Sequence, residues 1–418
     1  MGLCSRRNIK IVWEIGEIVK KVDINIIGYI IYLLIYVITV SLYGFGNSIS
    51  NYRYYLLFGL CLLSFFIIFL AKKQLKKIYV NKSLLLSIVV GIVFLIISYI
   101  KAHNVNMSLQ LRTFVQISLF LLPTIYAFYI SNFLSNDKII QMMKITLVIL
   151  IFAYFFDFQE PDHHLLQFLN LQNWLSIDYI HSNSFTESNH WSEAFLQLFF
   201  FFYYCLHSDK MNLKNEKDIK IYQNISFVFT IFSFKRLSIL ISIVVLLFGK
   251  YIINKKFKKN HFFIFTTIFT IATIFYTKFM MGDFADYDTV FDLTSGRNYI
   301  LGLWKLQNYL SYGYGTSLLV IGRYLEMDLV QIYMELNLFS LFIFILYCFY
   351  ICKKNVYVNI IMLYFFLNML TASTLPQQIG FLIMMTSISF TLKNDKNIEN
   401  KKINYDIDVK DIWKNLII

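Results

Sequence analysis

The chain has 418 residues, of which 58% are hydrophobic and only 15% are charged, and its mean hydropathy is +0.58. A soluble domain averages about 45–50% apolar and about 25% charged residues, so this composition excludes a soluble enzyme. Intrinsic disorder is excluded as well, because it requires low hydrophobicity.

Twelve stretches of the chain are apolar enough to cross a bilayer, which takes about 20 mostly apolar residues per helix. Their apolar runs are continuous rather than alternating, which favours helices over the strands of a barrel. The sequence therefore predicts an all-α, polytopic membrane protein with about twelve transmembrane helices in one integral membrane domain, 1–418. The predicted spans are 26–43, 53–70, 83–100, 112–130, 139–157, 191–207, 221–234, 237–253, 261–278, 329–352, 355–372 and 376–392.

The formal net charge of +13 is explained by the orientation of these spans. Cytoplasmic loops of membrane proteins carry an excess of Lys and Arg. With twelve crossings, most of the 38 basic residues fall on one side, and both termini lie in the cytoplasm, including the tail 393–418. Nucleic-acid binding is not needed to account for the charge, and we expect none.

Two connections on the predicted outer face are long, 158–190 and 279–328, and long ordered loops are usually functional. The first contains no Lys or Arg, and its apolar residues predict a short amphipathic helix on the membrane surface. The second is acidic in its first half. A helix is then expected to begin near Ser295 and to end at the turn Gly313-Tyr314-Gly315.

Lys235, Arg236 and Arg297 are basic residues on the predicted outer side, against the general distribution of charge. They are interpreted either as side chains that reach lipid phosphates at the interface or as a binding site for a polyanion. A guanidinium group binds phosphate oxygens in bidentate fashion, so the three cations are suited to a diphosphate. The loop histidines, His190 among them, fit no helical metal-ligand spacing, and we predict neither a metal nor a cofactor.

Three carboxylates lie within or at the ends of predicted spans: Glu193, Asp328 and Glu335. Carboxylates inside a membrane are candidates for function, and a buried one can serve as a general base. The alternatives are a hydrogen bond between packed helices or, for Asp328, an N-cap. His190 lies near the same interface as Glu193 and is a further polar candidate.

The order of these motifs resembles the Wzy-type polysaccharide polymerases of the O-antigen ligase and polymerase superfamily. The matching pieces are Phe234-Lys235-Arg236, Ser295-Gly296-Arg297, Trp304, Tyr312-Gly313-Tyr314-Gly315 and Asp328-Leu329-Val330-Gln331 with Glu335.

The resemblance implies transfer of a growing glycan from undecaprenyl diphosphate to a lipid-linked repeat unit at the outer face of a bacterial inner membrane. The implied reaction inverts the anomeric centre and needs neither a metal nor a nucleotide sugar. Undecaprenyl-diphosphate-linked glycan, membrane lipid and a chain-length regulator protein are the implied partners. The resemblance and the properties of the individual residues together give a set of expected site residues. The expected catalytic residues are Arg236, Arg297, Asp328 and Glu335, and the expected substrate-binding residues are Lys235, Tyr314, Glu193 and His190.

Two alternatives share the membrane topology and the glycan partner. Ligases tend to carry a His-Asn pair where this chain has Met327-Asp328, which favours a polymerase. A flippase for lipid-linked oligosaccharides is expected to have two similar halves, and the sequence has no internal repeat.

Overall fold

The structure is a computed structural model, and it is mostly helical in the part of the chain that it describes. The described residues are 24–41, 52–70, 82–155, 191–211, 215–233, 235–257, 261–281, 297–306, 310–321, 325, 327–352, 355–372, 375 and 378–395. Within these ranges there is no strand, and Lys256 and Asn355 form an isolated antiparallel bridge. The all-α prediction is confirmed.

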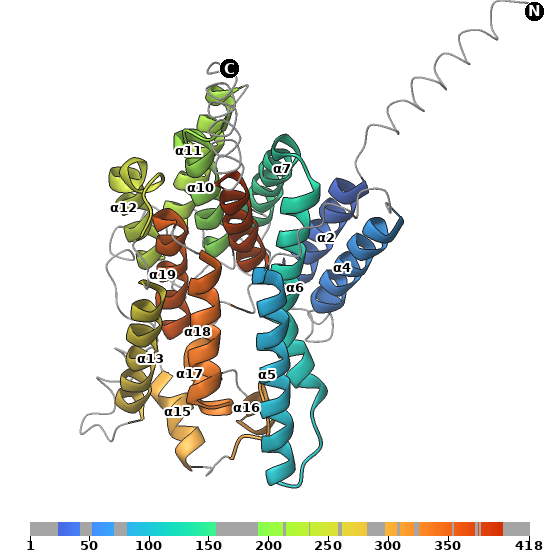
Figure 1. The fold of residues 1–418 in the computed structure, drawn as a ribbon, viewed down its shortest axis with the longest axis vertical. Coiled ribbons are helices and arrows are strands. Elements are labelled where there is room, and N and C mark those ends of the chain that lie inside the picture. Colours follow the sequence, from blue (N-terminus) through green and yellow to red (C-terminus); the bar gives the residue numbers. More distant parts are fainter. Residues whose placement is uncertain are drawn as a thin grey trace, which may run out of the picture.

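The first helices form one side of the bundle, where α2 packs on α4 and α7, and α6 packs on α4 and α5 (Figure 1). Their bounds are α2 (Ile24–Ser41), α4 (Tyr52–Leu70), α5 (Lys82–Asn104), α6 (Leu111–Phe133) and α7 (Asn136–Phe155). Pro123 lies within α6 without ending the helix. Each helix covers one predicted span.

In the described part of the second half, four longer helices are followed by three short ones and then by two longer ones. These are α10 (Ser192–His207), α11 (Glu216–Phe232), α12 (Arg236–Ile252), α13 (His261–Met280), α15 (Arg297–Leu306), α16 (Ser317–Ile321), α17 (Asp328–Glu335), α18 (Leu338–Cys352) and α19 (Val356–Thr371). A last helical segment covers residues 378–395. The short helices α15 and α16 fall in the predicted long loop 279–328 and lie at the lower end of the bundle (Figure 1).

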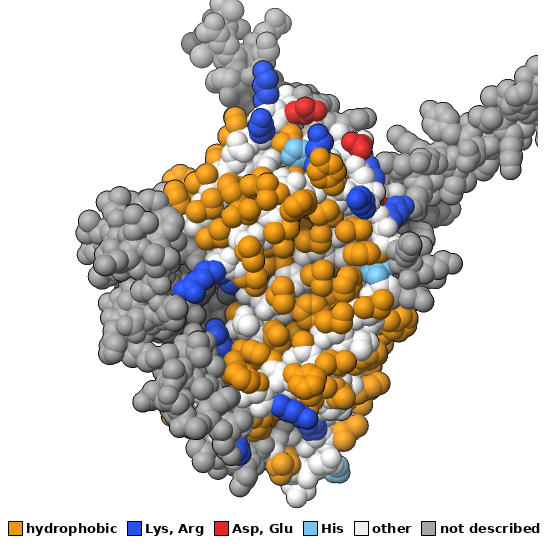
Figure 2. All heavy atoms as spheres, turned by 90° about the vertical axis from the view of Figure 1, so that its left-hand side faces the viewer, with side chains coloured by type: hydrophobic (Ala, Val, Ile, Leu, Met, Phe, Trp, Pro, Cys, Tyr) orange, Lys and Arg blue, Asp and Glu red, His pale blue; other side chains and the backbone are white. Residues whose placement is uncertain are grey.

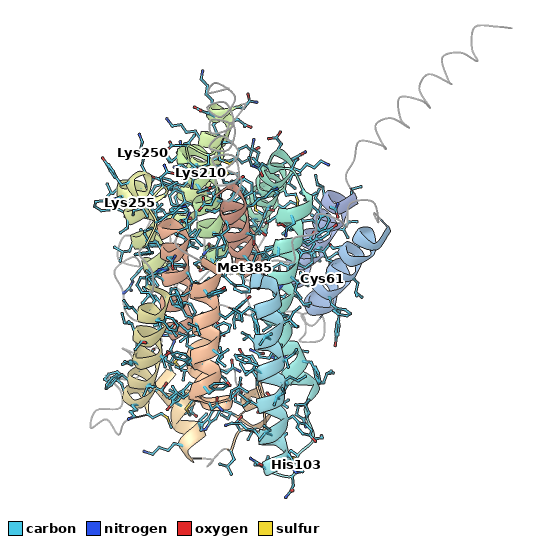
Figure 3. All side chains as sticks on the ribbon, in the orientation of Figure 1. Cys61, His103, Lys210, Lys250, Lys255 and Met385 are labelled. Carbon is cyan, nitrogen blue, oxygen red and sulfur yellow. The ribbon has the colours of Figure 1, made fainter. Side chains whose placement is uncertain are left out.

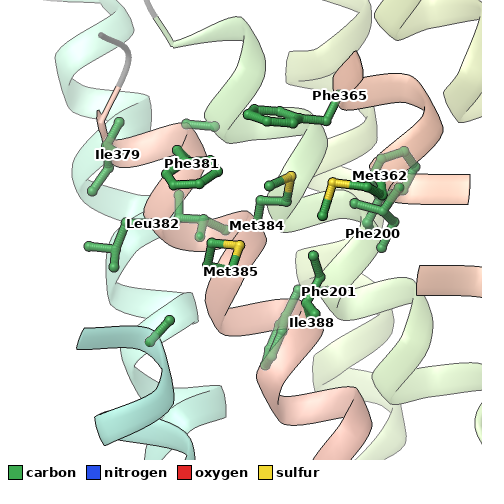
Figure 4. Close-up of a cluster of buried hydrophobic side chains, with 14 of the residues drawn as sticks. Phe200, Phe201, Met362, Phe365, Ile379, Phe381, Leu382, Met384, Met385 and Ile388 are labelled. Carbon is green, nitrogen blue, oxygen red and sulfur yellow. The ribbon is translucent and has the colours of Figure 1, made fainter. Parts of the chain in front are cut away.

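The core is built around α10, whose residues are buried along nearly its whole length. This helix packs against α7, α11 and α12. Phe200 and Phe201 of α10 meet Met362 and Phe365 of α19 and side chains of the segment 378–395 (Figure 4). A polar side chain on α10 is therefore enclosed by other helices and must find its partners among them.

The predicted span 329–352 is wrong as a single helix. The chain breaks at Leu336, with φ −101° and ψ −81°, and α18 starts again at Leu338. The Asn337 side chain stabilises the new start, because its Oδ1 accepts from the Ser340 N–H at 2.8 Å and from the Ser340 hydroxyl at 2.9 Å. Hydropathy is an average over the whole stretch, so it does not detect that a single side chain, Asn337, competes with the helix for a backbone N–H group.

In the part of the chain that the structure describes, three helices are both long and apolar enough to cross a membrane, Leu86–Asn104, Leu111–Phe133 and His261–Met280, and they mark the chain as a membrane protein. One face of the molecule is a broad hydrophobic surface, with basic side chains at its upper end and others at its left edge and lower end (Figure 2). Lys210, Lys250 and Lys255 lie at that end, whereas His103 lies at the opposite one (Figure 3).

Two predicted features fall wholly or mostly outside the described residues. The loop 158–190 and its surface helix, with His190, lie there, as does the acidic first half of the second loop, 282–296. Of the predicted tail 393–418, the structure describes 393–395, which end the last helix. There Asp395 forms an ion pair with Lys210, and Lys393 donates to the Leu134 carbonyl at 2.9 Å.

Candidate functional site

Glu193 is the centre of a buried polar network in the first turn of α10, and its side chain is only 1% exposed. Its Oε1 accepts from the Gln197 amide at 2.8 Å. Its Oε2 accepts from the Tyr364 hydroxyl at 2.7 Å and from the Asn368 amide at 3.1 Å, both on α19. A carboxylate in the first turn also benefits from the positive end of the helix, so this environment supports a buried negative charge.

Lys235 brings a positive charge to this network. Its Nζ lies 3.9 Å from Glu193 Oε2, which is within ion-pair range but longer than a hydrogen bond, and its side chain is 15% exposed. Lys235 is the N-cap residue of α12 in an extended backbone conformation, without a side-chain cap hydrogen bond. Its backbone carbonyl accepts from the Ile239 N–H and so starts the helix.

Arg236 follows directly as the first residue of α12, and in contrast to Lys235 it is exposed. The helix start is tied to the buried network a second time, because the Ser238 hydroxyl lies 2.8 Å from the Tyr364 hydroxyl. The sequence named Glu193, Lys235 and Arg236 as site residues without predicting this contact; the structure places Lys235 within ion-pair range of Glu193, and Arg236 follows Lys235 in the chain. The beginning of α12 combines two consecutive cations with a helix N-terminus, and both favour an anion.

Gly380 fits this arrangement because it leaves room for the Glu193 side chain. A Cβ atom at Gly380 would lie 2.8 Å from Glu193 Cγ and 3.0 Å from Glu193 Cβ. Any larger residue would have to push the carboxylate away from its donors. The last helical segment thus closes the network on the side facing α10.

Glu335 lies in a second polar cluster, and its carboxylate holds the turn that ends the second long loop. Its Oε2 accepts from the Gly315 N–H at 2.5 Å and its Oε1 from the Ser317 N–H at 2.9 Å. Glu335 is fully buried, and Lys101 of α5 is close enough to interact with it electrostatically. These contacts give Glu335 a structural role, because its carboxylate holds the backbone of this turn in place.

The turn packs tightly on α5 and α6. The Tyr314 N–H donates to Ser98 Oγ at 3.1 Å, and the Tyr314 ring meets Phe94 edge-on at 5.4 Å. Gly313 and Gly315 have φ values of +140° and +82°, which favour glycine. Tyr314 is completely buried, which makes it a packing residue of this turn. Burial, and then the charge of Glu335, raise the pKa of the neighbouring Tyr312, which keeps its phenol protonated.

Asp328 is buried in the first position of α17, but it does not cap the helix, because the N-cap is Met327. The N-cap alternative for Asp328 is therefore wrong. Its Oδ2 instead accepts from the Leu375 N–H at 2.8 Å. Leu375 belongs to the connection between α19 and the last helical segment, so Asp328 fastens this connection itself, while Glu193 is hydrogen-bonded to α19 on one side of it.

Arg297 is the first residue of α15 and is half-buried. Ile300, Leu301 and Trp304 of the same helix pack in a small apolar cluster with Met280 and Val330. Helix α15 packs on α13, whereas α12 packs on α10, α11 and α19. Arg236 and Arg297 therefore begin helices in different parts of the bundle, with α17 and α19 in the chain of packed helices between them.

The sequence did not point to four members of the buried network: Gln197, Ser238, Tyr364 and Asn368. They were hidden because each is a common residue inside an apolar helix. A usable signal does exist, since Gln197 follows Glu193 by four positions and Asn368 follows Tyr364 by four, which places each pair on one helix face. Among the described residues, no group of three or more His, Cys, Asp or Glu side chains lies together to hold a metal ion.

No protein-family model, curated protein or solved structure matches the chain.

Proposed function

We propose that the chain is a polysaccharide repeat-unit polymerase, a glycosyltransferase that moves a growing glycan from undecaprenyl diphosphate onto a lipid-linked repeat unit. The observation that carries the proposal is the start of α12. There Lys235 and Arg236 are presented together by a helix N-terminus that a buried network fixes in place. A diphosphate leaving group gains negative charge as its bond to the sugar breaks, and fixed cations favour that change.

In this proposal Arg236 and Lys235 bind the lipid diphosphate, whereas Arg297, which begins α15 in a different part of the bundle, is assigned to the substrate separately from this cation pair. The order of the sequence motifs supports the assignment of Arg297. Glu193 forms the ion pair with Lys235. Glu335 and Tyr314 hold the turn Gly313–Ser317 of the second long loop against the bundle. Asp328 is retained as the candidate base, and His190 as a substrate-binding residue on the first long loop.

The proposal includes twelve spans in a bacterial inner membrane, two long outer loops and both termini in the cytoplasm. The gathering of Lys210, Lys250 and Lys255 at one end of the bundle supports this orientation, because cytoplasmic ends are rich in basic residues (Figure 3). The described helices α2, α4, α7, α10, α11, α12 and α19, the interrupted pair α17 and α18, and the last helical segment 378–395 then cross together with α5, α6 and α13.

The second candidate function is a flippase for lipid-linked oligosaccharides. The break between α17 and α18 favours it, because discontinuous helices are frequent at the substrate sites of transporters.

One reconstitution experiment tests both candidates. Purified protein is given only lipid-linked repeat units, in the presence of a metal chelator, and the products are resolved by length. A polymerase lengthens the glycan under these conditions. Movement of intact units across a vesicle with no new glycosidic bond would establish the flippase instead, and a requirement for added metal would contradict the proposed chemistry.

A further inference from the structure

The position of Lys235 between Glu193 and Arg236 bears on how firmly the site holds its ligand. On one side of Lys235 the Glu193 carboxylate is 1% exposed and is fixed by donors from two helices. On the other side Arg236 is exposed at the start of α12. An anion at the start of α12 would meet two consecutive cations, of which Lys235 is also within ion-pair range of Glu193.

We propose that Glu193 is a positioning residue that competes with the diphosphate for Lys235 and thereby keeps the product releasable. This inference rests on the proposed function. The 3.9 Å separation fits such sharing, because the ammonium is attracted by the carboxylate without being locked to it by a short hydrogen bond.

The chemistry of the reaction supplies the reason for such a device. A diphosphate linked to both a lipid and a sugar carries about two negative charges, and release of the sugar end adds a further ionisable oxygen, with a pKa of about 6. A purely cationic site would therefore bind the product more tightly than the substrate. A fixed negative charge behind Lys235 opposes the added charge of the product, because like charges repel strongly in a water-poor interior.

Glu193 is held in a way that suits this role. Its carboxylate is anchored by neutral donors, the Gln197, Tyr364 and Asn368 side chains, so it remains in place when Lys235 turns towards a ligand. Gly380 faces its Cγ and provides the space that this position of the side chain needs. The negative charge is thus stationary, and the flexible lysine is the part that moves.

The test compares the binding of inorganic pyrophosphate by the full chain in neutral detergent, free of anionic lipid, for the wild type and three variants. Glu193→Gln removes the charge and preserves the shape, and it should bind pyrophosphate about tenfold more tightly. Lys235→Met should bind more weakly. In the double variant most of the gain from Glu193→Gln should vanish, because the shared lysine is gone.

A steady-state readout separates this role from a merely structural one. With lipid-linked repeat units, Glu193→Gln should lower kcat without raising KM, and added polyprenyl diphosphate should inhibit it at lower concentration than it inhibits the wild type. The matched control is Asp395→Asn, which disrupts the Lys210–Asp395 ion pair beyond the opposite end of α10 and should leave pyrophosphate affinity unchanged. Should Glu193→Gln fail to fold, Glu193→Asp withdraws the carboxylate from Lys235 and should shift affinity in the same direction by less.

Pyrophosphate binding by the Glu193 variants that is equal to or weaker than that of the wild type would overturn the inference. It would also be overturned if the wild type bound phosphatidylglycerol but not pyrophosphate. These outcomes are independent of the proposed function. A chain that binds pyrophosphate as described but lengthens no glycan would contradict the polymerase and retain the role of Glu193 in anion binding.

Discussion

Lys235 and Arg236 are neighbours in sequence, yet their surroundings give them different tasks. Lys235 is mostly enclosed and is paired with Glu193, whereas Arg236 is exposed at the first position of α12. A side chain that must meet a large lipid-linked substrate needs exposure, and one that tunes the local charge needs a fixed partner. Arg236 is therefore the residue whose loss should affect the reaction most directly.

Arg236→Ala should leave the protein inserted in the membrane but reduce glycan elongation by about 100-fold, the usual cost of losing one group that stabilises developing negative charge. Arg297→Ala should act in the same direction. The measurement is the length ladder of the surface glycan, with membrane abundance of each variant as the reference. Lys250→Ala, which removes a cation from the opposite end of α12, should keep the wild-type ladder; an unchanged ladder in Arg236→Ala would contradict a diphosphate clamp.

Tyr364 and Tyr357 offer a matched pair on α19, because each is buried and donates one hydroxyl hydrogen bond of 2.7 Å. Tyr364 donates to Glu193, and Tyr357 donates to the Phe200 carbonyl. Each Tyr→Phe change should lower the free energy of unfolding by about 1–3 kcal/mol, the cost of leaving a buried acceptor unsatisfied. Only Tyr364→Phe should also reduce elongation. Thermal unfolding in detergent and the glycan ladder measure the two effects, and equal ladders would remove Tyr364 from the site.

At the scale of elements, the turn Gly313–Ser317 fixes part of the second long loop against the helices α5 and α6. Its backbone N–H groups are held by Glu335, and its glycines approach α6 closely. A Cβ at Gly315 would lie 3.2 Å from Gln116 Cβ, in a backbone conformation with φ +82°. The turn is therefore sensitive to a single added methyl group.

Gly315→Ala should destabilise the protein by about 1–3 kcal/mol, because a non-glycine residue is strained at positive φ. Gly302→Ala is the control: Gly302 lies within helix α15 with no atom within 4 Å of the added Cβ, and alanine there should be neutral or stabilising by about 0.5–1 kcal/mol. Thermal unfolding of both variants gives the comparison. Similar unfolding temperatures would show that the turn carries no strain.

Hydropathy predicted the positions of the long helices to within a few residues because an apolar run of that length allows little else in a membrane. It was wrong for 329–352, where the Asn337 side chain competes with the helix for the Ser340 N–H. The sequence named Glu193 and Lys235 separately as site residues, because both are charged residues in apolar surroundings, but it did not predict that they pair. Tyr364 and Asn368 could not, because their role depends on which helix faces α10, and a single sequence does not specify this packing.

At the scale of the whole molecule, lysines gather at one end of the bundle, while the opposite end carries basic side chains as well, such as Lys101 in the last turn of α5. Lys210, Lys250 and Lys255 lie at one end and His103 at the other (Figure 3). A bilayer that contains the bundle must then bury the hydrophobic surface between them (Figure 2). The orientation proposed above assigns the lysine-rich end to the cytoplasm.

Cysteine labelling checks this orientation. In intact cells a membrane-impermeant maleimide should label Ser108→Cys, in the exposed connection between α5 and α6, but not Lys255→Cys. Inside-out vesicles should give the reverse. The native Cys205, Cys348 and Cys352 are buried and should contribute little background, which the unmodified protein measures. Labelling of Lys255→Cys in intact cells would reverse the proposed orientation.

The interruption at Leu336–Asn337 also predicts where deuterium enters the protein. The first N–H groups of α18 have no carbonyl of a preceding turn to donate to, and Asn337, Leu338 and Phe339 are exposed at the side chain. Amide exchange at 337–339 should therefore be fast, flanked by slow exchange in α17 and in the rest of α18. A peptide map would then show a narrow window of rapid isotope uptake inside what hydropathy presents as one uninterrupted apolar segment.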